Sequence, residues 1–344
     1  MEHPVTEAVT GLDLVEWQLR VAQGEPLPLT QEQLRFQGHA IEVRLCAEDE
    51  HFTPHTGKVL HFLPPPLGEG GGGGSIRFDH ALFQGLEVPP FYDSMLGKLI
   101  VHAPTRAEAI DQLAAALDRT QLLGLPTNRR FLAGCLRHPE FRAGAALIHF
   151  LDHNAGELRE ALIREEQLAL VPSALAALYA SPGERCTELP CPFPRPLRLL
   201  HRGRMLALQV RERADGALDV DQDGQTQSIE PPIGAWVRTD SGAWHVQAGP
   251  LDLVVEDVSF QPAANAGGAA GANELRAPFN GKVIAVKAQP GSIVVRGDTL
   301  LVLESMKLEH ALAASRDGVV KAVHVEQGQQ AATSQVLVTF EAAA

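Results

Sequence analysis

A lysine with apolar neighbours on both sides is the most unusual candidate for chemistry in this chain. Lys307 lies between Met306 and Leu308 in the stretch "LVLESMKLEHAL". A surface lysine usually has polar neighbours, and a core position usually excludes a charged amine. The elements around Lys307 therefore decide whether its amine is an ordinary surface charge or a group presented for chemistry.

An internal repeat surrounds this lysine. Residues 281–305, "GKVIAVKAQPGSIVVRGDTLLVLES", align without gaps with residues 318–342, "GVVKAVHVEQGQQAATSQVLVTFEA", at a constant offset of 37. Each copy reads as strand, turn, strand, strand, so the pair predicts a small all-β barrel or sandwich with pseudo-two-fold symmetry. Lys307 follows the last strand of the first copy, which places it at a hairpin tip, exposed and far from the core. A lone lysine at a tip would most often serve solubility.

A segment rich in alanine and glycine precedes the repeat. Residues 261–273, "QPAANAGGAAGAN", carry no charge and read as a flexible linker. As random coil this linker has an end-to-end distance of roughly 20 Å, and fully extended it spans at most about 45 Å. We expect the C-terminal domain to move relative to the rest.

Two other features resemble chemical motifs but lack essential parts. The run "GEGGGGGS", residues 68–75, lacks the Gly-Lys-Ser/Thr ending of a phosphate loop and precedes a strand, "SIRFDHALF", so we expect a flexible loop. Cys186 and Cys191 can be read as half a metal site, but no second ligand pair follows. We therefore predict no metal site, and free thiols in a reducing cytoplasm for all four cysteines.

Composition excludes several classes of protein. The 344 residues are enough for two or three domains, and 45% of them are hydrophobic, which favours folded cores. The formal charge of −13 argues against a surface that binds nucleic acid or anionic membrane. The sequence contains neither a run long enough for a transmembrane helix nor a basic-then-apolar signal at its start. We expect a cytoplasmic protein.

The first 154 residues predict a mixed α and β domain. "GHAIEVRLCAED" alternates like a strand, "GKVLHFLPPP" reads as a second strand, and residues 105–122 form an amphipathic helix with a capping box at Thr105 and Glu108, ended by Gly124 and Pro126. The apolar residues within 9–21 are spaced as on one face of a helix, and Thr10 or Asp13 can cap that helix. The abrupt start suggests that these residues belong to a larger fold whose front part is absent.

Residues 157–260 predict a helix and an antiparallel β-barrel. The helix "ELREALIREEQLALVPSALAALYA" contains Pro172, which we expect to kink or divide it. Seven short alternating segments follow, separated by turn residues as in a meander, and so many strands suggest a barrel wrapped around the helix. No catalytic motif is present, so we expect this segment to pack or to bind a partner.

The stretch around Lys307 resembles a known attachment motif. "ESMKLEH" is similar to the Glu-Ala-Met-Lys-Met motif of biotin carboxyl carrier domains, and "APFNGKV" resembles their entry strand. The resemblance implies that Lys307 carries covalent biotin, with Met306 as its matching neighbour. Leu308 replaces the usual second methionine with a residue of similar size. Lipoyl carriers share the fold, but they usually have Asp before the lysine and Ala after it.

The front of the chain resembles the C-terminal lobe of biotin carboxylase. "EHPVTEAVTG", "GHAIEVRLCAED" and "PPFYDSMLGKLIVHAPTRAEAI" carry the resemblance. It implies that Glu2 acts as a base toward bicarbonate, and that Arg77 holds bicarbonate and stabilises the biotin enolate. A guanidinium suits this role because it is always charged and matches a planar anion. The ATP-binding parts of that family are not found in the sequence, so we expect no ATP cleavage by this chain alone.

The order of these segments resembles the α subunit of acyl-CoA carboxylases of the propionyl-, 3-methylcrotonyl- or geranyl-CoA type. It implies a partial carboxylase lobe (1–154), a helix-plus-barrel domain (157–260) that contacts a carboxyltransferase β subunit, a linker (261–274) and a biotin carboxyl carrier domain (275–342). The missing ATP-binding lobe and a biotin protein ligase are further implied partners, and ATP, Mg²⁺ and bicarbonate act in the complete enzyme. A non-catalytic carrier or assembly protein and a lipoyl-type carrier remain the alternatives.

Overall fold

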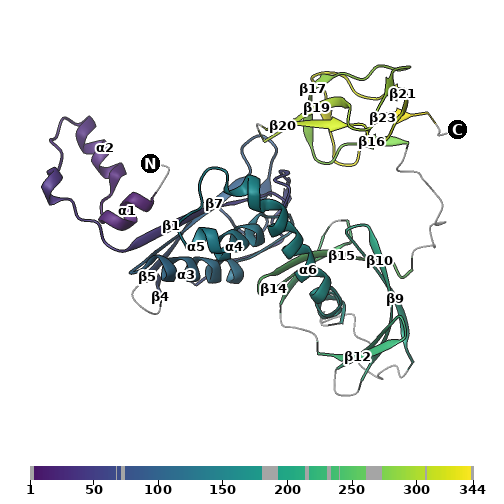
Figure 1. Ribbon diagram of the computed structural model, residues 1–344, viewed down its shortest axis with the longest axis horizontal. Helices are drawn as coiled ribbons and strands as arrows, with labels where there is room; N and C mark the ends of the chain where they lie inside the picture. The colour runs from purple at the N-terminus through teal and green to yellow at the C-terminus, as the bar shows by residue number, and fades with distance from the viewer. Residues whose placement is uncertain are drawn as a thin grey trace. The chain divides into compact units, whose positions relative to one another are not determined.

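The computed structural model describes residues 4–66, 68–70, 74–179, 193–213, 217–230, 234–239, 241–260, 273–306 and 308–341. The predictions for Glu2, Lys307, Cys186, Cys191 and nearly all of the linker fall outside these ranges. The chain divides into two compact units, whose helices and strands are labelled in Figure 1. The first comprises residues 1–46, 59–86 and 95–259, and the second comprises residues 47–58, 87–94 and 260–344.

Short helical segments open the first unit: α1 (Val5–Thr10), α2 (Leu14–Ala22) and the 3-10 helix η1 (Gln31–Gln33). Gly11 adopts a left-handed φ of 72° that ends α1. The Asp13 carboxylate accepts a hydrogen bond of 2.9 Å from the Glu16 amide and caps α2. The single helix predicted for residues 9–21 is therefore wrong in its bounds, and Asp13 rather than Thr10 is the cap.

An antiparallel sheet forms the centre of the carboxylase-like part. Its order is β1-β7-β5-β4, made of β1 (His39–Cys46), β7 (Met95–Ala103), β5 (Gly74–His80) and β4 (Gly68–Gly70). The strand predicted from "GHAIEVRLCAED" is confirmed as β1. The loop predicted for residues 68–75 is wrong at both ends, because residues 68–70 form β4, which pairs with β5, and β5 itself begins at Gly74. The strand predicted from "GKVLHFLPPP" is divided into β2 (Gly57–Lys58) and β3 (His61–Leu63).

Helix α3 (Arg106–Arg119) packs across β1 and β7 of this sheet. Its capping box is confirmed: the Glu108 amide donates to Thr105 Oγ1 at 3.2 Å, and the Thr105 amide donates to the Glu108 carboxylate at 3.3 Å. The helix ends earlier than predicted, because β8 (Gln121–Leu123) follows at once and pairs with β3. α4 (Arg129–Arg137) and α5 (Pro139–Arg142) come next.

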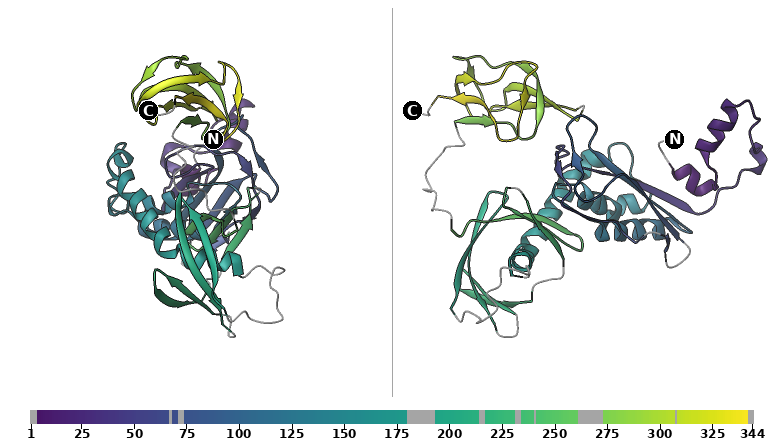
Figure 2. Two further views of the ribbon diagram at one scale, coloured as in Figure 1. Left: turned by 90° about the vertical axis from the view of Figure 1, so that its right-hand side faces the viewer. Right: turned by 180° about the vertical axis from the view of Figure 1, so that it is seen from behind.

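A half-barrel surrounds the helix α6 (Phe150–Tyr179), as the right-hand view of Figure 2 shows. All seven predicted segments are strands: β9 (Arg195–His201), β10 (Arg204–Glu212), β11 (Leu218–Gln222), β12 (Gln225–Ile229), β13 (Ala235–Arg238), β14 (Trp244–Ala248) and β15 (Leu251–Asp257). Their spatial order is β12-β11-β10-β9-β15-β14-β13, so two meanders join where β15 pairs with β9. Within the described residues the barrel is open.

The half-barrel core is built from the C-terminal half of α6 and the inner faces of the strands. Ala174 and Leu175 are fully buried against Leu199, Val220 and Val255. Of the two predicted effects of Pro172, a kink or a division of the helix, the division is wrong, since α6 runs through it. The carbonyl that loses its hydrogen bond at a proline belongs to the residue four positions earlier, here Leu168, a residue that is 85% exposed.

The second unit contains the repeat, folded as two four-stranded sheets. Their orders are β16-β23-β21-β18 and β20-β19-β17-β22. The strands are β16 (Glu274–Arg276), β17 (Gly281–Val286), β18 (Ile293–Val294), β19 (Thr299–Ser305), β20 (Leu308–Ala313), β21 (Gly318–Val323), β22 (Gln330–Ala331) and β23 (Val336–Phe340). β17, β18 and β19 correspond to β21, β22 and β23 at the offset of 37 residues. The predicted pseudo-two-fold symmetry is confirmed, and its matched residues Val283 and Val320 are both fully buried.

Two loops that lie far from the repeat in sequence complete the second unit. β2 pairs with β6 (Glu87–Val88) between residues 47–58 and 87–94. The Asn280 side-chain amide donates to Thr56 Oγ1 at 2.8 Å, which fastens the repeat domain to these loops. Among the described residues, no helix has both the length and the apolar composition required to cross a membrane.

Candidate functional site

The turn before β20 is the first candidate site. β19 and β20 are antiparallel neighbours, and Ser305 pairs with Leu308, so only residues 306 and 307 connect the two strands. This confirms the hairpin predicted at this point. Two-residue hairpin connections favour positive φ, which glycine and asparagine adopt most easily. Met306 nevertheless has a φ of 49°. Lys307 itself lies outside the described residues.

Met306 is held in this conformation by its surroundings in the second unit. Its side chain is only 2% exposed, and its amide donates to the Pro90 carbonyl at 3.3 Å. A non-glycine residue in the left-handed region costs about 1–3 kcal/mol and persists only where neighbouring contacts fix it. The structure therefore assigns Met306 a role in shaping the turn, which is consistent with its predicted place beside the attachment lysine.

Arg77 forms the second candidate site, on β5 of the first unit. Its Nε and Nη2 donate to both Asp79 carboxylate oxygens at 2.7 and 2.6 Å, and its Nη1 donates to Glu7 Oε2 at 3.5 Å. Residues two apart on a strand share a face, which brings Arg77 and Asp79 together. The hydrogen bonds to Asp79 raise the pKa of Arg77 above its usual value, although partial burial opposes this shift.

A cavity of about 530 Å³ opens beside Arg77. Its polar lining includes Glu7, Asp13, Ser75, Arg77 and His102. A guanidinium in such a cavity can bind a small planar anion through two parallel hydrogen bonds. Here, however, the edge formed by Nε and Nη2 already binds Asp79, so an anion that uses this edge must compete with that carboxylate. Glu2, the predicted base, lies outside the described residues.

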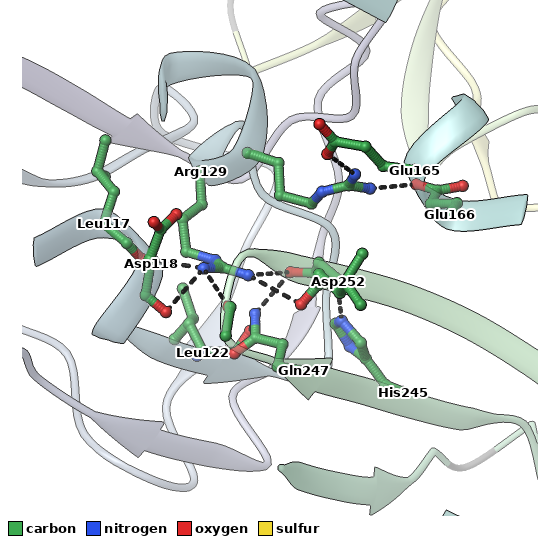
Figure 3. A network of polar contacts seen from close by, with 12 residues as sticks. Leu117, Asp118, Leu122, Arg129, Glu165, Glu166, His245, Gln247 and Asp252 are labelled. Carbon is green, nitrogen blue, oxygen red and sulfur yellow. Dashed lines mark hydrogen bonds and ion pairs between the residues drawn. The ribbon is translucent and has the colours of Figure 1, made fainter. Parts of the chain in front are cut away.

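A buried polar network joins α4 to the half-barrel within the first unit (Figure 3). Arg129, 1% exposed, donates from Nη1 to the Leu117 carbonyl at 3.0 Å and from Nη2 to the Leu251 carbonyl at 3.2 Å. Its Nη2 also lies 3.6 Å from Asp252 Oδ2. Burial of an unpaired charge is costly. The buried Arg129 of α4 therefore needs the acceptors that the half-barrel supplies.

Side chains of β14 extend the same network to β8. The Leu122 amide donates to Gln247 Oε1 at 2.9 Å, and the Gly124 amide donates to His245 Nδ1 at 3.0 Å. Because His245 Nδ1 accepts, its proton is on Nε2, which donates to Asp252 Oδ1 at 2.7 Å. These bonds fasten the hairpin of β14 and β15 to the carboxylase-like part.

The neighbouring Arg130 fastens the helix of the half-barrel. Its Nη1 donates to Glu166 Oε1 at 2.5 Å, and Glu166 on α6 also accepts from Arg202 Nε at 2.7 Å. Glu166 is 3% exposed. Burial disfavours its ionisation, but its hydrogen-bond partners outweigh that effect and lower its pKa. Consecutive arginines of α4 thus bind two different parts of the half-barrel.

Comparisons with known proteins identify a domain in each half of the chain. Residues 42–153 match the family described as "Biotin carboxylase C-terminal domain", and residues 273–340 match "Biotin-requiring enzyme". The chain joins a biotin carboxylase C-terminal domain to a biotinyl domain. The recognition of both domains is confirmed, except that the motif "EHPVTEAVTG" lies outside the residues matched to the carboxylase C-terminal domain. Residues 1–30 match "Carbamoyl-phosphate synthase L chain, ATP binding domain", so a segment of the ATP-binding type precedes the carboxylase domain.

Curated relatives cover the whole chain. The "Methylcrotonoyl-CoA carboxylase subunit alpha, mitochondrial" of Rattus norvegicus is 30% identical over 99% of this chain and 52% of its own length. The "Propionyl-CoA carboxylase alpha chain" of Ruegeria pomeroyi is 30% identical over 99% of this chain and 57% of its own length. The chain is homologous to these α subunits and spans about half of their length. A solved single-chain, multi-domain long-chain acyl-CoA carboxylase matches 99% of this chain and 26% of its own, at 26% identity and a TM-score of 0.42.

Several residues of both sites were not predicted from the sequence. Asp79 could have been found, because it lies two positions after Arg77 on a predicted strand. The loop residues Pro90 and Phe91 beside Met306 had no local signal, since only the tertiary structure brings them there. The buried positions of Arg129 and Asp252 likewise depend on contacts between distant segments.

Proposed function

We propose that this chain is the biotin-carrying, C-terminal part of the α subunit of a biotin-dependent acyl-CoA carboxylase, with biotin attached to Lys307. The observation that carries the proposal is the connection of two residues, Met306 and Lys307, between paired strands of a biotinyl domain. We expect Lys307, at the end of this hairpin, to be accessible to a modifying enzyme and to a second active site. The lysine amine there can form an amide with the biotin carboxyl group.

The residues of this chain fit the transfer of a carboxyl group. Bound biotin supplies a ureido nitrogen that carries carboxylate from one active site to another. The tight turn, held by the burial of Met306 and its bond to Pro90, would fix the base of the biotinyl arm. Arg77 would hold bicarbonate by two parallel hydrogen bonds, and Glu2 would act as base. Formation of carboxybiotin uses ATP, Mg²⁺ and bicarbonate, and we assign this step to the complete enzyme.

Two protein partners follow from this function. A carboxyltransferase β subunit would accept the carboxyl group, and the half-barrel would contact it. A biotin protein ligase would modify Lys307. The support is homology to proteins named as α subunits over 99% of this chain. We favour a branched, unsaturated acyl-CoA as the final acceptor, as the name of the methylcrotonoyl-CoA carboxylase relatives suggests.

We further propose a cytoplasmic location. Among the described residues, Cys135 is a free thiol. Burial raises the pKa of Cys135 to about 11, so its thiol stays protonated and unreactive at neutral pH. Unreactive free thiols are typical of proteins from reducing compartments.

Intact mass spectrometry tests the attachment. The chain, the variant Lys307→Arg and the control Lys287→Arg would each be co-expressed with a biotin protein ligase. We expect one biotinyl group on the unchanged chain and on Lys287→Arg, and none on Lys307→Arg. A folded chain that gains no biotin, or that gains a lipoyl group from a lipoyl ligase instead, would overturn the proposal.

A further inference from the structure

A small pocket lies beside Met306 in the second unit. Its volume is about 190 Å³. Phe91 and Met306 supply its large apolar side chains, and Lys282, Glu304 and Gln330 supply its polar ones. Ligand pockets commonly combine apolar walls with a few polar groups that fix the orientation of the ligand. The pocket adjoins the residue that precedes Lys307 in the sequence.

The walls of the pocket are fixed by structure on both sides. Lys282 and Glu304 are direct partners across β17 and β19. Gly281, also in the lining, has no room for a side chain, because a Cβ there would lie 2.7 Å from the Glu304 carbonyl oxygen. Pro90, next to Phe91 in the lining, is held by the hydrogen bond from the Met306 amide to the Pro90 carbonyl. These backbone contacts therefore fix the shape of the pocket.

The lining indicates a neutral ligand with a compact apolar part. Phe91 is 74% exposed, so much of its side chain can contact a ligand. The charges of Lys282 and Glu304 offset each other, so the pocket does not select an ion. Glu304 can accept hydrogen bonds from N–H groups, while Gln330 and Lys282 can donate to a carbonyl. A compact ring system with a urea group on one edge satisfies all of these requirements.

We propose that this pocket holds the bicyclic head of the biotin carried on Lys307 while the biotinyl domain rests against residues 87–94. The inference rests on the proposed attachment at Lys307. The ureido N–H groups face Glu304, the ureido carbonyl faces Gln330 or Lys282, and the fused rings lie between Phe91 and Met306. The pocket keeps the unloaded arm from other surfaces until the domain moves to an active site.

Weak binding is enough for this role because the ligand is tethered. A short flexible tether gives an effective concentration in the millimolar range. A pocket with a dissociation constant of about 1 mM would then be occupied for at least about half of the time. An arm that leaves readily is also what a carrier requires, since tight binding would slow each transfer.

The rate at which streptavidin captures the biotinylated chain tests the proposal. Streptavidin needs the whole ring system, so a biotin held in the pocket is captured only during the fraction of time it spends outside. Replacing Phe91 with alanine should raise the capture rate about two- to fivefold. The variant Gln330→Trp, which fills the pocket instead of opening it, should raise the rate by a similar factor. Tyr92→Ala is the matched control, because Tyr92 is the adjacent aromatic residue, 69% exposed, and is not in the lining.

Intact mass, measured first, separates the two proposals. A chain without biotin contradicts the attachment at Lys307. A chain with one biotin whose capture rate equals that of Phe91→Ala and Gln330→Trp contradicts only the pocket. An equal increase in Tyr92→Ala would also overturn it, because the effect would then belong to the loop in general. Circular dichroism shows whether each variant keeps its fold. Because Phe91→Ala opens the pocket and Gln330→Trp fills it, the test still stands if one of the two variants does not fold.

Discussion

The Arg129 guanidinium and the Asp252 carboxylate form an ion pair inside the joint between the carboxylase domain and the half-barrel. Their closest atoms are 3.6 Å apart, and the Arg129 and Asp252 side chains are only 1% and 15% exposed. Four backbone carbonyls, those of Leu117, Asp118, Gly249 and Leu251, also accept from Arg129. The α4 helix and the hairpin of β14 and β15 therefore depend on each other for the satisfaction of buried polar groups.

Removal of the Arg129 charge should destabilise this joint strongly. Arg129→Met keeps much of the side-chain volume but leaves Asp252 and several carbonyls without their partner. We expect a loss of about 3–5 kcal/mol in the free energy of unfolding, as for other broken buried pairs. Urea unfolding followed by tryptophan fluorescence would measure it, since Trp236 and Trp244 pack against the half-barrel core.

The control comes from the same helix. Arg137 also pairs with a carboxylate, that of Asp118, but its side chain is 48% exposed. Exposed pairs contribute at most about 1 kcal/mol, so Arg137→Met should stay within that limit. Equal losses in the two variants would show that burial of Arg129 is not the cause.

Acid should weaken the same joint through Asp252. Burial opposes ionisation of this carboxyl group, but His245, Arg129 and Gln247 outweigh it and lower its pKa to about 2 from an ordinary value of 3.8. A depressed pKa stabilises the folded state above the unfolded pKa, and this contribution is lost as pH falls through the folded pKa. The loss should thus occur between about pH 4 and pH 2 and amount to about 2 kcal/mol.

Comparison with Asp252→Asn isolates this titration. The stability difference between the unchanged chain and the variant should shrink by about 2 kcal/mol as pH is lowered across that window. Glu166 contributes to the background in the same direction, because its pKa is also lowered. A difference that stays constant between pH 5 and pH 2 would mean that Asp252 does not titrate as the structure implies.

Much of this fold is visible in the sequence because its hairpins are local. Alternating residues between turn dipeptides such as Asp223-Gly224 predicted all seven strands of the half-barrel. The repeat predicted the two sheets of the biotinyl domain and the position of the turn before Leu308, since a shared pattern of buried residues such as Val283 and Val320 demands a shared fold.

The features that the sequence did not show depend on contacts between distant residues. β15 pairs with β9 through Glu256 and Leu200, and nothing in either strand specifies the other. Arg129 reads as an ordinary surface residue, because its burial depends on acceptors supplied by a hairpin far along the chain. Residues 68–70 read as a loop because glycine disfavours strands, but their backbone groups still pair with β5.

The internal repeat allows a matched test of the close backbone contact at Gly281 in the biotinyl domain. Gly281 and Gly318 occupy equivalent positions, but a Cβ at Gly281 would lie 2.7 Å from the backbone oxygen of Glu304, whereas one at Gly318 would meet only the flexible end of Arg316 at 3.4 Å. Gly281→Ala should therefore cost about 1–3 kcal/mol through overpacking. Gly318→Ala should be neutral, or stabilising by up to about 1 kcal/mol through the reduced freedom of the unfolded chain. Thermal unfolding of both variants would decide, and equal effects would contradict the close approach at Gly281.

Removal of the Asp79 charge should strengthen the binding of bicarbonate to Arg77. Asp79 accepts two hydrogen bonds from the Arg77 guanidinium, so bicarbonate must displace a carboxylate to bind by the same edge. Asp79→Asn keeps the shape but removes the charge, and a neutral acceptor holds a guanidinium about 1 kcal/mol less tightly than a charged one. Bicarbonate should then bind about fivefold more tightly, as measured by amide chemical shifts of β5 during titration.

Asp111→Asn, which breaks the exposed pair with Arg142, is the control and should leave the affinity unchanged. Weaker binding in Asp79→Asn would show instead that Asp79 orients Arg77 for the anion, and Arg77→Lys should weaken binding in either case because lysine lacks the planar fork.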